Sequence, residues 1–120
     1  MFVRITSGDL WIRALTVLTL FAALSCSRES SRASHQSGIG KMLEGDFRGA
    51  ARKFERALDT DPANASAAAN LGVAFWKLGS TSKSIAAFRK AADLNRRDPR
   101  PLEFLGNIYL HERKWKEADA

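Results

Sequence analysis

The sequence is poor in the residues that build most catalytic and metal sites. Its 120 residues contain one cysteine, Cys26, and two histidines, His35 and His111, which are far apart along the chain. No second histidine follows His111 one helical turn later, so the histidine pair of a helical zinc site is missing. No serine-nucleophile elbow and no cysteine–histidine pair is found. We therefore expect no metal, no cofactor and no enzyme active site in these residues.

Proline is also scarce, and neither sign of charge dominates. Three prolines, 45% hydrophobic and 27% charged residues are typical of a folded helical protein rather than a disordered one. Nineteen basic against thirteen acidic residues give a net charge of +6, which can favour an anionic lipid or an acidic partner. The basic residues are scattered and form no nucleic-acid motif, so we expect neither nucleic acid nor a small-molecule substrate as a ligand.

The N-terminal segment has the pattern of an export signal. Arg4 and Arg13 precede a run from Ala14 to Cys26 that has no charged residue. A basic region followed by an apolar region of this length is typical of a signal peptide. A transmembrane helix needs about 20 apolar residues, and Arg28 and Glu29 interrupt this run. We expect residues 1–25 to be a signal peptide, with an uncleaved anchor as the alternative.

The end of this segment points to Cys26 as a lipidation site. Ala23 and Ser25 form the small-x-small pattern that signal peptidase accepts before Cys26. Residues 23–26 resemble the bacterial lipobox, although Leu24 lies one place later than in the commonest form. Acylation would also remove a lone thiol from an oxidising compartment. The alternative is a cysteine that merely ends an apolar run.

These observations predict an exported lipoprotein of the bacterial cell envelope, facing the periplasm or the exterior. Residues 27–34 show no apolar periodicity, so we expect residues 26–34 to be a flexible tether after the lipidated cysteine.

The rest of the chain repeats itself every 34 residues. Gly38, Gly72 and Gly106 are separated by this interval, as are Gly45 and Gly79. The same offset relates four further pairs of similar residues, namely Phe54 and Phe88, Ala57 and Ala91, Leu71 and Leu105, and Phe75 and Tyr109. The period and the residue types resemble the tetratricopeptide repeat, whose pattern places Leu-Gly and an aromatic in one helix and Ala and Phe in the next.

The resemblance implies an all-α solenoid of helix-turn-helix units over residues 35–120. It has about 2.5 repeats, near 31–64, 65–98 and a truncated 99–120. We expect helices at 35–44, 47–60, 64–78, 81–94, 98–112 and from about 115 onward. Each repeated glycine leaves room for an aromatic of the paired helix, Gly45 and Gly79 end helices in the left-handed conformation, and Trp115 is expected in the core.

The resemblance also implies a binding groove. In this family the first helices of successive pairs line a concave face that takes peptides or partner helices. Aligned positions on that face are Asn70, Val73, Trp76, Lys77, Arg100, Phe104, Asn107 and His111. Trp76 and Phe104 are the expected apolar anchors, and the two asparagines can bind a peptide backbone. For Trp76, packing between repeats is the alternative.

Some relatives clamp a terminal carboxylate on this face, which is not expected here. Asn70 and Arg100 fit that arrangement, but His35, Ile39 and Phe104 occupy the other positions.

We therefore predict a lipid-anchored scaffold or adaptor that binds a protein or peptide partner. The alternative is the N-terminal interaction region of a larger exported enzyme with a catalytic domain beyond residue 120. We also expect the chain to be a fragment, because the last helix stops short and would leave Leu105, Ile108 and Tyr109 without part of their cover.

Overall fold

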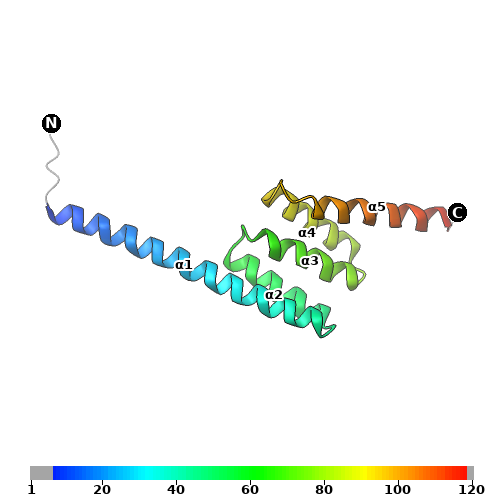
Figure 1. Ribbon diagram of the computed structural model, residues 1–120, viewed down its shortest axis with the longest axis horizontal. Helices are drawn as coiled ribbons and strands as arrows, with labels where there is room; N and C mark the ends of the chain where they lie inside the picture. Colours follow the sequence, from blue (N-terminus) through cyan, green and yellow to red (C-terminus); the bar gives the residue numbers. More distant parts are fainter. Residues whose placement is uncertain (1–6, 119–120) are drawn as a thin grey trace.

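The computed structural model describes residues 7–118, which form helices and, within that range, no strand. The helices are α1 (Ser7–Leu43), α2 (Phe47–Thr60), α3 (Ala65–Lys77), α4 (Thr81–Leu94) and α5 (Arg100–Ala118). Antiparallel pairs α1–α2 and α3–α4 stack side by side, and α5 covers the end of the stack (Figure 1). The predicted all-α repeat solenoid is confirmed. Arg4, in the basic part of the expected signal peptide, lies outside the described residues.

Each helix pair is held together by a glycine and an aromatic. An ideal Cβ atom on Gly38 of α1 would lie 2.6 Å from Cε1 of Phe54, and one on Gly72 of α3 would lie 2.8 Å from Cε1 of Phe88. Both phenylalanines are fully buried. Any larger residue at these glycines would overlap the ring, so the 34-residue period is a repeated close contact between paired helices.

The turns within the pairs also follow from glycine. Gly45 and Gly79 have φ angles of 81° and 75°, in the left-handed region that other residues seldom adopt. Gly45 N–H donates to the carbonyl of Met42 at 3.0 Å, and Asp46 N–H donates to that of Lys41 at 2.9 Å. These bonds satisfy carbonyls at the end of α1 and reverse the chain into α2.

Two buried serines add polar links between helices. Ser84 of α4 donates its hydroxyl proton to the carbonyl of Gly72 at 2.8 Å. Ser31 of α1 donates to the carbonyl of Ala57 at 2.8 Å and accepts from Asn64 Nδ2 at 3.0 Å. Both hydroxyls are therefore satisfied in the core, where an unpaired hydroxyl would be costly.

The prediction that residues 26–34 form a flexible tether is wrong. These residues are helical, and Ser31 is fully buried against α2. Residues 31–43 lie 34 positions before α3, so the first helix of the first repeat, expected at 35–44, already includes Ser31. No proline or glycine occurs between Ala14 and Ser37 to end a helix, which explains why α1 continues through the segment.

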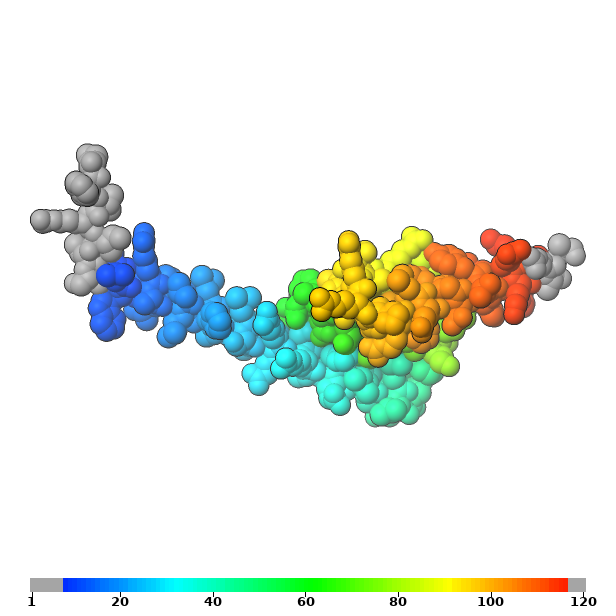
Figure 2. Space-filling view, turned by 45° about the horizontal axis from the view of Figure 1, so that its top comes forward, coloured from blue at the N-terminus to red at the C-terminus, as the bar shows by residue number. Residues whose placement is uncertain are grey.

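The N-terminal part of α1 projects from the solenoid as a single helix (Figures 1 and 2). Its apolar side chains are exposed, among them Leu10, Trp11, Leu18 and Phe21. The helix is long and apolar enough to cross a membrane, a test that N-terminal signal sequences also pass.

The third repeat differs from the prediction. Helix α5 is continuous from Arg100 to Ala118, without a turn at Arg113 or a separate helix from 115. Arg113 stands where the other repeats have a turn glycine, so the signal that ends the helix is absent. Trp115 is 69% exposed and is not a core residue.

The burial of apolar residues on α5 also differs from the prediction. Leu105 and Ile108 are buried against Phe88, so the prediction that they lack cover is wrong, while Tyr109 is exposed. Ile85 of α4 and Val73 and Trp76 of α3 pack against this cluster, whereas Gly106 has nothing within 4 Å of an added Cβ.

Replacing Gly38 should test the close contact between α1 and α2. The added methyl of Gly38→Ala meets a buried ring that has no space to move, so we expect the free energy of unfolding to fall by about 1–3 kcal/mol. Gly106→Ala is the matched control, because the same change in open space should raise stability by about 0.5–1 kcal/mol through helix propensity. Urea unfolding of the full chain in mild detergent, followed by circular dichroism, measures both. Equal effects of the two changes would contradict the proposed contact.

Candidate functional site

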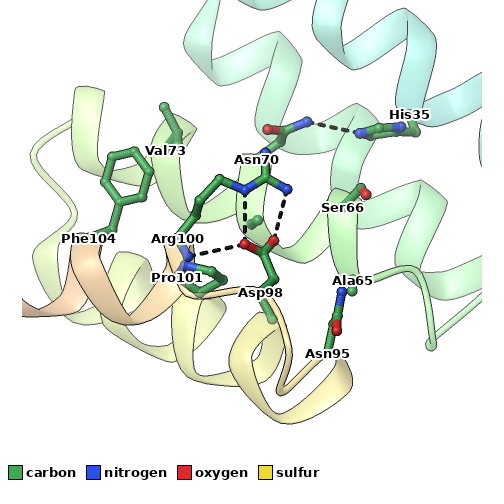
Figure 3. A pocket seen from close by; sticks show the side chains of 12 residues that line it. His35, Ala65, Ser66, Asn70, Val73, Asn95, Asp98, Arg100, Pro101 and Phe104 are labelled. Carbon is green, nitrogen blue, oxygen red and sulfur yellow. Dashed lines mark hydrogen bonds and ion pairs between the residues drawn. The ribbon is translucent and has the colours of Figure 1, made fainter.

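A cavity of about 290 Å³ opens on the face formed by α1, α3 and α5. Figure 3 shows that its walls come from the first helices of successive pairs and from the loop that precedes α5. The lining residues are His35, Ala65, Ser66, Ala69, Asn70, Val73, Ala91, Asn95, Asp98, Arg100, Pro101 and Phe104. The groove, as we call this cavity from here on, lies where the sequence predicted a concave binding face.

A hydrogen bond between α1 and α3 crosses one side of the groove. Asn70 Nδ2 lies 2.9 Å from Nε2 of His35. Burial lowers the pKa of His35, which favours the neutral ring, and a neutral Nε2 can accept the amide proton. The amide oxygen of Asn70 lies on the side away from His35 (Figure 3), so it is placed to accept a hydrogen bond from a ligand.

An ion pair forms the opposite side. The guanidinium of Arg100 donates from Nε to Oδ1 of Asp98 at 2.9 Å and from Nη2 to Oδ2 at 2.8 Å. These hydrogen bonds lower the pKa of Asp98 and raise the pKa of Arg100. Asp98 therefore offsets the charge of Arg100, whose side chain remains 78% exposed.

Phe104 and Val73 supply the apolar part of the groove. The Phe104 ring stacks on Phe88 with a centroid distance of 4.9 Å and an interplanar angle of 5°. Phe104 is 41% exposed although it contacts the core. It therefore combines a fixed orientation with an open surface, which suits an anchor for a ligand's apolar side chain.

Half of the predicted binding residues meet in the groove. Asn70, Val73, Arg100 and Phe104 line it. Lys77 and Asn107 are exposed but are not among its lining residues. His111 lines a separate cavity, of about 370 Å³, that includes Trp115.

Trp76 is mainly a packing residue. It contacts the cluster of Phe88, Leu105 and Ile108, and its ring meets His111 edge-on at 5.3 Å. This arrangement favours the alternative role that the sequence left open for it.

Three further polar residues line the groove and were not predicted from the sequence, namely Ser66, Asn95 and Asp98. Asp98 lies just before α5 in the sequence, but its pairing with Arg100 depends on side-chain conformations. Within residues 7–118 no group of three His, Cys, Asp or Glu side chains could hold a metal ion.

Comparison with known proteins agrees with this architecture. The fold is that of a tetratricopeptide-repeat solenoid. Residues 42–99 match the tetratricopeptide-repeat family model. No curated protein sequence matches the chain.

A solved structure with the same fold is the second TPR of Spaghetti (RPAP3), bound to the HSP90 peptide SRMEEVD. The likeness has a TM-score of 0.62 at 20% sequence identity and covers 79% of this chain and 94% of that one.

Proposed function

We propose that this protein is an exported, lipid-anchored adaptor of the bacterial cell envelope that holds an extended segment of a partner protein in the groove. The observation that carries the proposal is the combination of the Asn70 amide and the exposed Phe104 ring in one groove on a repeat solenoid. An amide that both donates and accepts suits a peptide backbone, and an aromatic anchor suits an apolar side chain.

The ion pair between Asp98 and Arg100 limits the class of peptide that the groove would bind. The similar repeat structure holds the acidic peptide SRMEEVD, which supports peptide binding by this fold. In this chain Asp98 already neutralises Arg100, and His35 favours its neutral form. We therefore infer that the groove takes an uncharged, extended stretch with an apolar residue over Phe104, rather than an acidic C-terminus.

The proposed anchor agrees with the exposure of α1. Cys26 is an exposed free cysteine directly after the apolar run. Residues 27–30 separate it from Ser31, the first buried residue of the solenoid. Two or more acyl chains on Cys26 would hold a protein at a membrane stably, since each buried CH₂ contributes about 0.8 kcal/mol. The short spacing would hold the groove close to the bilayer.

Fatty-acid labelling tests the anchor. Expressed in a bacterium, the wild-type chain should incorporate a fatty-acid probe and fractionate with membranes, because Cys26 becomes the acylated mature N-terminus. Cys26→Ala should lose the label while the chain is still made. Labelling that survives the substitution would rule out a lipid on Cys26.

Peptide selection tests the groove. Peptides enriched from a displayed random library by the full chain in detergent should bind at least about fivefold more weakly to Phe104→Ala, a change of about 1–3 kcal/mol typical of an aromatic anchor. Leu102→Ala is the matched control, because Leu102 is an exposed apolar residue of α5 outside the groove lining. Equal weakening by both substitutions would contradict the assignment. So would selected peptides whose binding is not weakened by Phe104→Ala.

A further inference from the structure

A second cavity, of about 520 Å³, lies beside the groove. Its walls come from α1, the loop between α2 and α3, and the first turn of α3. The lining residues are Arg28, Arg32, His35, Asp61, Ala63, Asn64, Ala65 and Ser66. His35, Ala65 and Ser66 also line the groove, so the two cavities are neighbours on one face of the solenoid. We call the second one the arginine cavity.

The arginine cavity carries an excess of positive charge. Arg28 and Arg32 are one helical turn apart on the same face of α1, and among residues 8–116 neither guanidinium forms an ion pair. Asp61 is the one carboxylate among the lining residues, and its Oδ1 already accepts the N–H of Ala63 at 3.1 Å. Glu29 is exposed and lies outside the lining. Two guanidinium groups against one carboxylate attract an anion.

The place of these arginines along α1 brings them close to the proposed anchor at Cys26. At 1.5 Å per residue, Arg28 lies about 3 Å and Arg32 about 9 Å along α1 from Cys26, where the acyl chains would enter the membrane. The headgroup layer outside the hydrocarbon core is roughly 5–8 Å thick on each side. Side chains on a helix lean toward its N-terminus, so the long Arg32 side chain can reach back to this layer.

We propose that the arginine cavity binds the phosphate of an anionic phospholipid in the leaflet that holds the anchor. The guanidinium fork of arginine matches phosphate oxygens by paired hydrogen bonds. The contact would fix the tilt of the solenoid on the membrane and thereby direct the neighbouring groove. This proposal rests on the membrane anchoring of the proposed function, and it adds a specific lipid contact to it.

Hydrogen exchange of the full chain in nanodiscs tests the lipid contact. In nanodiscs with about one third phosphatidylglycerol, amides of residues 61–66 and 28–35 should exchange at least about threefold more slowly than in pure phosphatidylcholine. Arg28→Gln with Arg32→Gln should abolish this difference. The matched control is Arg52→Gln with Arg56→Gln, an exposed pair of the same spacing on α2, which should keep it. A third sample has phosphatidylcholine nanodiscs with millimolar inorganic phosphate.

The hydrogen-exchange results distinguish the lipid contact, free phosphate binding and the anchor. Protection that requires phosphatidylglycerol and both arginines supports it. Equal protection by inorganic phosphate would overturn the lipid as the source, and a chain that enters nanodiscs but shows no lipid dependence would overturn the contact while leaving the anchor intact. A chain that is not recovered with nanodiscs would overturn the anchor and this proposal together, whereas peptide binding by the groove is measured independently in detergent.

Discussion

The fit of an aromatic ring against a glycine is the constraint on which the rest of this structure depends. Phe54 lies against Gly38 and Phe88 against Gly72, at distances that no side chain at the glycine would permit. Because each pair closes in the same way, the two units have the same geometry and stack in register. The first helices α1, α3 and α5 then fall on one face, which is where the groove and the arginine cavity lie.

The parts of the fold that repeat could be predicted from the sequence. The observed bounds of α2 and α4, Phe47–Thr60 and Thr81–Leu94, are those expected from the 34-residue period, because glycine ends the preceding helix and a polar cap begins the next one. The period gives no information on what precedes Ser31 or on a turn that lacks its glycine. The continuous helices α1 and α5 were therefore not anticipated, since nothing in either segment breaks a helix and propagation is favourable once a helix has begun.

The candidate site was predictable to a similar degree. Repeat alignment brought Asn70, Val73 and Phe104 to one face, because backbone geometry alone determines which positions face the groove. It did not predict that Asp98 would neutralise Arg100 or that Trp76 would pack against His111, since these pairings depend on side-chain conformations across helix boundaries. The electrostatic character of the groove, which decides the class of peptide we propose, is therefore a result of the structure.

Helix α1 connects the proposed activities. Cys26, at the end of its apolar part, is the proposed anchor, Arg28 and Arg32 follow it, and residues 31–43 form the first helix of the solenoid. A partner segment in the groove would therefore be held at a set height above the membrane, with one helix linking lipid and ligand. This organisation depends on the integrity of the repeat contacts, because α1 packs on the solenoid through Gly38 and Phe54.

A double-mutant cycle at the second repeat tests the central claim most directly. Gly72→Ala should destabilise the full chain by forcing a methyl group into the Phe88 ring, and Phe88→Leu should destabilise it by leaving a void. If the glycine and the ring occupy shared space, the double variant should be more stable than the sum of the single effects predicts, with a coupling energy of at least about 1 kcal/mol from chemical denaturation. Additive losses would contradict the account, because they would show that Gly72 and Phe88 act independently.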